Sequence, residues 1–124
     1  MRLILAAAFT LTLAHPASAV CLCLATETLS GTDAMLASLA TIPDSLRPNP
    51  KQGRGLLYKA PKPTQDRRID LPTLGPATVQ AAANAGLGGI AWEAGHTLTL
   101  DLPTMQQIAQ DQGLFLWSRV PAQR

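Results

Sequence analysis

A chain of 124 residues is long enough for one small domain. Its net charge of +2 is too small to predict a nucleic-acid-binding protein, and an aromatic fraction of 4% is too low for a surface that stacks bases. The hydrophobic fraction of 47%, supplied mostly by alanine and leucine, is typical of a globular domain in which helices pack on a sheet.

Residues 1–19 have the composition of a secretory signal peptide. Arg2 supplies the positive charge, residues 3–14 form an apolar run, and residues 17–19 (Ala-Ser-Ala) match a small-residue cleavage site. The apolar run is short for a membrane-spanning helix. The alternative interpretation is a spurious N-terminal extension whose alanine-rich composition imitates a signal. Under both interpretations the domain occupies residues 20–124.

The first elements of that domain are a strand, a helix and a loop. Residues 21–28 alternate loosely between β-branched and apolar side chains, which predicts the strand. Ser30 or Thr32 can cap the helix, and Pro43 marks its end. The apolar stripe of this helix consists of Met35, Leu36 and Leu39. The proline- and glycine-containing segment 42–53 predicts the loop.

The middle of the chain predicts a second strand, a long loop, a second helix and a third strand. Residues 55–59 form the short buried strand, and the charge- and proline-rich segment 60–72 forms the loop. The helix begins at Pro76 and ends before Gly86, following the preference for proline at the first helical position and glycine just past the last. Residues 89–93 predict the next strand. The buried side of the helix is predicted to hold Val79, Ala82, Ala83 and Leu87.

The C-terminal part predicts a strand, a helix and a last strand. Residues 97–100 form the first of these, Asp101 caps the helix, Gly113 ends it, and residues 114–117 form the last strand. The residues at helical spacing are Leu102, Met105, Ile108 and Ala109. The resulting order, β-α-β-loop-α-β-β-α-β, predicts a small layered α/β domain.

The basic residues are concentrated in one stretch of the sequence. Six of the ten Lys and Arg residues are Lys51, Arg54, Lys59, Lys62, Arg67 and Arg68. A cationic loop between a strand and a helix N-terminus predicts an anion site, because backbone N–H groups and basic side chains both bind phosphate. A solvated surface loop is the alternative. Asp70 is interpreted either as a ligand of a divalent cation or as an ion-pair partner of Arg67 or Arg68.

Four further side chains have structural interpretations. Glu93 and His96 flank a turn, and a lone histidine there is expected to be a hydrogen-bonded turn residue rather than a metal ligand. Trp92 and Trp117 are expected in the core or at a domain interface rather than in a stack with a substrate.

Three motifs carry a resemblance to a known family. Residues 55–76 read Gly-Leu-Leu-Tyr-Lys-Ala-Pro-Lys-Pro-Thr-Gln-Asp-Arg-Arg-Ile-Asp-Leu-Pro-Thr-Leu-Gly-Pro, and residues 27–35 read Glu-x-x-x-Gly-Thr-Asp-Ala-Met. Residues 86–116 contain Gly-Leu-x-Gly-Ile-Ala, then Glu-Ala-Gly-His, then Gly-Leu-Phe-Leu. In this order and spacing the motifs resemble the C-terminal domain of the LpxI-type UDP-2,3-diacylglucosamine pyrophosphatases, over roughly residues 22–118.

The resemblance implies a metal-dependent hydrolase of lipid A and lipopolysaccharide biosynthesis in Gram-negative bacteria. Such enzymes convert UDP-2,3-diacylglucosamine to UMP and 2,3-diacylglucosamine 1-phosphate, use Mg²⁺, and act in the cytoplasm or at the inner-membrane surface. Carried over to this sequence, the resemblance makes Asp70 the catalytic and metal-binding residue. The substrate-binding residues that it implies are Thr32, Asp33, Lys59, Lys62, Gln65, Arg67 and Arg68.

The resemblance does not extend to the family's N-terminal domain, so several functions stay open. The chain is expected to be a truncated hydrolase that uses a separate N-terminal domain. The alternatives are a non-catalytic domain that binds a glycolipid or nucleotide sugar, and an inactive remnant. A true signal peptide would place the domain in the periplasm. Helix capping is the alternative role for Asp33.

Overall fold

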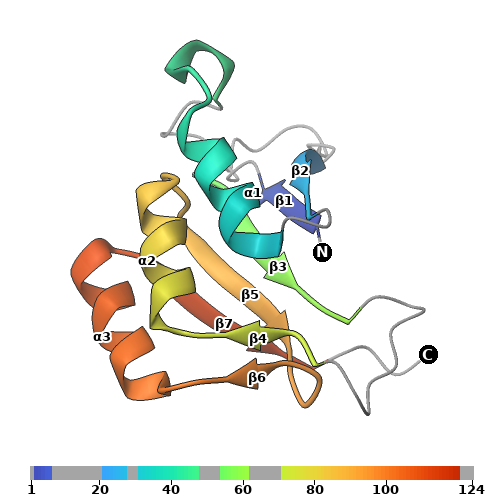
Figure 1. Ribbon diagram of the computed structural model, residues 1–124, viewed down its shortest axis with the longest axis vertical. Coiled ribbons are helices and arrows are strands. Elements are labelled where there is room, and N and C mark those ends of the chain that lie inside the picture. The colour runs from blue at the N-terminus through green and yellow to red at the C-terminus, as the bar shows by residue number, and fades with distance from the viewer. Residues whose placement is uncertain (1, 7–20, 28–30, 48–53, 62–70, 121–124) are drawn as a thin grey trace, which may run out of the picture.

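The computed structural model describes residues 2–6, 21–27, 31–47, 54–61 and 71–120. They form a five-stranded sheet in the order β2-β1-β3-β5-β7 and a two-stranded sheet of β4 and β6 (Figure 1). The strands are β1 (Arg2–Ala6), β2 (Cys21–Thr26), β3 (Leu56–Lys59), β4 (Thr73–Leu74), β5 (Gly89–Glu93), β6 (Leu98–Thr99) and β7 (Phe115–Arg119). The helices are α1 (Gly31–Ala40), α2 (Pro76–Asn84), α3 (Leu102–Gln112) and the short 3-10 helix η1 (Asp44–Leu46).

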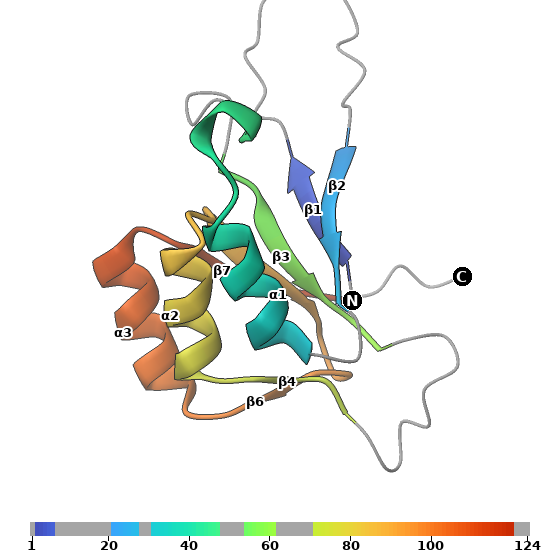
Figure 2. The ribbon, with the colours of Figure 1, turned by 45° about the horizontal axis from the view of Figure 1, so that its top comes forward.

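The sheet is mixed, with a parallel half and an antiparallel half. β3, β5 and β7 run parallel, whereas β1 runs antiparallel to both of its neighbours, β2 and β3. Figure 2 shows α1, α2 and α3 side by side on one face of this sheet. The described part of the chain is therefore a layered α/β structure, which confirms the predicted fold class.

The predicted order of elements is confirmed, with additions. The sequence does not predict β1, and it assigns residues 60–72 to a loop that ends just before β4. β1 takes the start of the segment interpreted as a signal peptide or spurious extension, and residues 7–20 lie outside the described residues. An apolar run can form a strand as readily as a signal sequence, which explains why composition did not separate these outcomes. Thr32 lies inside α1, so it is not the N-cap of that helix.

The core lies between the helices and the parallel strands. Leu57 and Ile90 are fully buried on β3 and β5, and Trp92 is 7% exposed on the same face. From the helices, the residues in this core include the predicted Met35, Leu36, Leu39, Val79, Ala82, Met105 and Ala109. Each large apolar side chain buried in this way stabilises the fold by about 1.5–3 kcal/mol. Trp92 is thus a core residue, as expected, whereas Trp117 on the edge strand β7 is 54% exposed.

The helix ends follow the predicted local chemistry. Gly75 caps α2 and Pro76 occupies its first turn. The Asp101 carboxylate caps α3 by accepting a hydrogen bond from the backbone N–H of Thr104 at 3.3 Å. Gly113 ends α3 with φ of 68°, a left-handed conformation that glycine adopts without steric cost.

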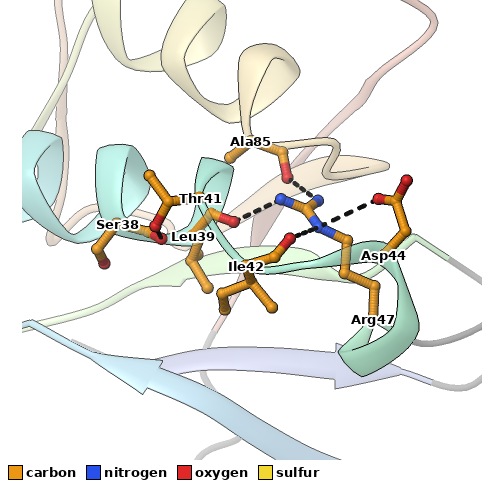
Figure 3. A network of polar contacts seen from close by, with 7 residues as sticks. All are labelled: Ser38, Leu39, Thr41, Ile42, Asp44, Arg47 and Ala85. Atoms are coloured by element: carbon orange, nitrogen blue, oxygen red, sulfur yellow. Dashed lines mark hydrogen bonds and ion pairs between the residues drawn. The ribbon is translucent and has the colours of Figure 1, made fainter.

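Arg47 joins the C-terminal ends of two helices (Figure 3). Its guanidinium donates to the carbonyls of Ile42 at 3.0 Å and Ala85 at 2.8 Å, and also to the carbonyl of Leu39. Leu39 belongs to α1 and Ala85 is the C-cap of α2, so one side chain satisfies the carbonyls of both helices. A Cβ at Gly86 would lie 2.8 Å from Nη1 of Arg47, so glycine leaves room for this contact.

We expect Arg47→Ala to lower the free energy of unfolding by about 2 kcal/mol, because three carbonyls lose a charged donor. Arg47→Lys should recover only part of the loss, because one amine cannot reproduce the planar guanidinium fork. Urea unfolding measures both variants. Asp44→Ala is the control, because Asp44 meets Arg47 at 3.9 Å and is fully exposed, so its loss should change little. An Arg47→Ala chain as stable as the wild type would contradict this role.

Candidate functional site

The carboxyl ends of the parallel strands and the starts of the helices lie at the same end of the molecule. β3 ends at Lys59, which pairs in register with Trp92 near the end of β5. Figure 1 shows the first turns of α1, α2 and α3 at the end toward which the arrows of β3 and β5 point. Ligands of open α/β sheets commonly bind at this end, where strand ends and the positive ends of helices meet.

Lys59 makes the central contact of this region. Its side-chain nitrogen donates to Oγ1 of Thr32 at 3.2 Å and to the backbone carbonyl of Thr73. Lys59 is 7% exposed and Thr32 is 8% exposed, so the contact is buried. It joins the end of β3 to the first turn of α1 and to the first residue of β4. Two predicted site residues that are far apart in the sequence are therefore neighbours in space.

Asp33 follows directly in the first turn of α1 and is exposed. Its carboxylate lies at the positive end of the helix, where it stabilises α1 and offsets nearby positive charge. Gly31 before it has a φ of +83°, and a Cβ built there would lie 3.9 Å from Oε1 of Glu27. Both interpretations of Asp33, helix stabilisation and ligand binding, are compatible with this exposed position.

The other predicted site residues lie between β3 and β4. Lys62, Gln65, Arg67, Arg68 and Asp70 fall within residues 62–70, outside the described residues. Of the predicted site residues, the structure thus brings together Thr32 and Lys59, and Asp33 follows Thr32 in the same turn of α1. The sequence did not predict the contact of Lys59 with the backbone carbonyl of Thr73, since no side-chain type signals a carbonyl acceptor.

The turn after β5 contains a second polar contact, between Glu93 and His96. Nε2 of His96 lies 3.8 Å from Oε1 of Glu93, and the backbone N–H of His96 donates to the carbonyl of Glu93 at 3.3 Å. His96 is thus a turn residue, as expected from the sequence. Beside it, Oγ1 of Thr97 is buried without a hydrogen-bond partner.

The described residues were searched for groups of metal ligands and for membrane-spanning helices. Within them, no three His, Cys, Asp or Glu side chains are grouped to hold a metal ion. Mg²⁺ needs no such group, because it is often held by one or two carboxylates together with water and substrate phosphates. Asp33 is a described carboxylate next to Thr32, and Asp70, the predicted metal ligand, lies outside the described residues. A search of the described helices found none with the length and apolarity to span a bilayer.

Comparison with known proteins identifies a family that covers most of the chain. The family model described as LpxI C-terminal domain matches residues 17–117. The chain belongs to the LpxI C-terminal domain family. A relative named UDP-2,3-diacylglucosamine pyrophosphatase LpxI, from Caulobacter vibrioides, is 47% identical over 103 residues, which cover 83% of this chain. The chain spans 37% of the length of that LpxI protein. The resemblance drawn from the sequence motifs is confirmed.

A substitution at Asp33 measures how much this carboxylate stabilises α1. Asp33→Asn should lower the free energy of unfolding by about 0.5 kcal/mol, and the difference should vanish in about 1 M salt, which screens helix-end electrostatics. Asp111→Asn is the matched control, because it removes a carboxylate near the C-terminal end of α3 and should not destabilise. Urea unfolding at low and high salt tests both. A loss at Asp33 that persists in salt would show a contact other than the helix dipole.

Proposed function

We propose that this chain takes part in hydrolysis of the diphosphate of UDP-2,3-diacylglucosamine, giving UMP and 2,3-diacylglucosamine 1-phosphate for lipid A biosynthesis. Membership of the LpxI C-terminal domain family supports the proposal, together with the printed name of the Caulobacter vibrioides relative. The structural observation that carries it is the buried contact between Lys59 and Thr32 at the N-terminal end of α1.

That contact favours an anionic ligand for an electrostatic reason. A basic side chain and the positive end of a helix dipole are close together there, and the low-dielectric surroundings strengthen their combined field. A diphosphate would be attracted to this field, and Asp33 offsets only part of it. The carboxyl ends of β3 and β5 place the field at the end of the sheet where ligands usually bind.

In the proposed reaction, the oxygen of a water molecule bonds to one phosphorus and the bridging phosphorus–oxygen bond breaks. The bridging oxygen leaves with the other phosphorus and takes up one proton of the water, and the second proton stays on the newly bonded oxygen or passes to solvent, so two phosphate monoesters result. Asp70 is the proposed catalytic carboxylate, which orients the water and holds the cation. Bound Mg²⁺ would neutralise charge on the diphosphate. The polar side chains proposed to line the diphosphate and sugar are Lys62, Gln65, Arg67 and Arg68.

The proposal includes a second polypeptide region. We propose that an N-terminal domain of the kind that the resemblance implies completes the cleft for the acylated sugar. The proposed place of action is the cytoplasm or the cytoplasmic surface of the inner membrane, where a UDP-linked lipid is available. A second candidate function is a domain that binds the nucleotide sugar without hydrolysing it, and the buried contact between Lys59 and Thr32 favours an anionic ligand in that case too.

The direct test incubates the purified chain with UDP-2,3-diacylglucosamine and Mg²⁺, with and without the N-terminal region of the Caulobacter vibrioides relative, and measures UMP. We expect release by the wild type in the presence of that region and a loss of at least about a hundredfold in Asp70→Ala, because a positioned carboxylate commonly contributes that much. Gln107→Ala, an exposed change on α3, is the control. If the folded wild type binds the substrate and releases no UMP, the chain alone is a binding domain.

Removal of the cation tests the metal dependence separately. Excess chelator should abolish UMP release, and added Mg²⁺ should restore it, because the substrate diphosphate is itself expected to carry the metal. Circular dichroism should be unchanged by the chelator, since the described fold holds no metal cluster that it depends on. Activity that survives the chelator would contradict the proposed magnesium requirement.

A further inference from the structure

We propose that Lys59 is a positioning residue, which locks α1 and β4 to the end of β3 rather than contacting the substrate. The expected effect on catalysis rests on the proposed function. The expected effect on the positions of α1 and β4 rests on the structure alone. By resemblance alone, Lys59 belongs with the substrate-binding side chains. The structure assigns its nitrogen to Thr32 and Thr73 instead.

Burial is the first argument. A lysine that binds a phosphate from solvent keeps its nitrogen at the wall of an accessible site, but Lys59 is 7% exposed and follows the pattern of the core-facing residues of β3. Its neighbour in that pattern, Leu57, is fully buried. Burying a lysine nitrogen is costly unless it is hydrogen-bonded, and the acceptors on Thr32 and Thr73 provide that compensation.

The choice of acceptors is the second argument. One is the hydroxyl in the first turn of α1, and the other is the carbonyl of the first residue of β4. β4 is short, with a single ladder to β6 in which Leu98 and Leu100 donate to Pro72 and Leu74 at 2.8 Å. A two-residue strand of this kind is marginally stable and depends on contacts with residues outside its sheet. The hydrogen bond from Lys59 to the carbonyl of Thr73 is such a contact, and in this sense Lys59 anchors β4.

The chain topology supplies the third argument. Lys59 is the last residue of β3 and Thr73 is the first of β4, so their hydrogen bond joins the two sides of the connection that contains Asp70. The same nitrogen fixes Thr32, beside Asp33. Lys59 therefore links the two described ends of the connection that contains Asp70 to the first turn of α1.

Hydrogen exchange tests the mechanical part in the full chain, whether or not the chain is active. Lys59→Met keeps the length and apolar stem of the side chain but removes its donors. We expect the backbone amides of Leu98 and Leu100 to exchange about tenfold faster, because β4 has lost its anchor. The amides of Leu114 and Phe115, bonded at the other end of the sheet, should be unchanged. Wild-type exchange at Leu98 and Leu100 would overturn the proposal.

Kinetics of UMP release tests the catalytic part. Lys59→Met should lower kcat about tenfold or more with KM changed less than about twofold, because positioning is lost and binding is not. Thr32→Val should act in the same direction, and the double variant should be no worse than Lys59→Met. Thr32→Ser should restore the rate. Thr41→Val, at the exposed far end of α1, is the matched control.

Lys59→Arg separates the two roles. A lysine that contacts phosphate should be replaced well by arginine, which binds phosphate strongly, whereas a buried anchor between two fixed acceptors has no room for the larger planar group. We therefore expect Lys59→Arg to fail in both assays. Restored activity in Lys59→Arg, or a raised KM with effects that add to those of Thr32→Val, would overturn the proposal. If the wild type releases no UMP, the proposed function fails for this chain, and exchange at Leu98 and Leu100 still decides the role of Lys59.

Discussion

Parallel pairing of β3 with β5, and of β5 with β7, is the constraint on which the rest of this domain depends. Because these strands share one direction, the connection after each strand must cross back over the sheet, and α2 and α3 provide those crossings on one face. The same constraint brings the strand ends and the helix starts to one end of the molecule. Lys59, as the last residue of β3, is thereby placed where it reaches both α1 and β4.

The C-terminal ends of the helices are neutralised by arginines of the domain, whereas the N-terminal ends face the proposed ligand site. This difference follows from the polarity of the helix dipole. In the three described α-helices the last turn contains no basic residue. Their carbonyls are instead met by two arginines from another part of the chain: Arg47 reaches α1 and α2, and Arg54 donates to Gly113 at the end of α3 at 3.0 Å. The negative helix ends are thus neutralised from within the domain, whereas the positive ends face the region where an anionic substrate is proposed.

The sequence could predict most of the elements but little of the site geometry. The residues that start and end helices located α2 and α3 to within a residue or two. The signals at Pro76, Asp101 and Gly113 act on the neighbouring backbone, so they can be recognised in the sequence. β4 was missed because two residues show no periodicity, and its strand character depends on pairing with β6. Arg47 falls in the segment that the sequence assigns to a loop, and its role is not visible there because its acceptors are main-chain carbonyls at the ends of α1 and α2. Lys59 and Thr32 were assigned to one substrate-binding site by the family resemblance, because neither their spacing in the sequence nor the composition predicts that they lie close together.

The buried lysine also explains why sequence resemblance and structure assign different roles to the same residue. A motif records that a residue type is needed, and a lysine within a phosphate-binding motif is naturally interpreted as a phosphate ligand. Burial adds the missing information, because the nitrogen already donates to Thr32 and Thr73. Under the positioning role proposed above, its positive charge acts on a ligand through the field that it adds to the start of α1. Lys59 can therefore be essential to an anion site by holding its parts in place, while the contacts to the anion come from other residues.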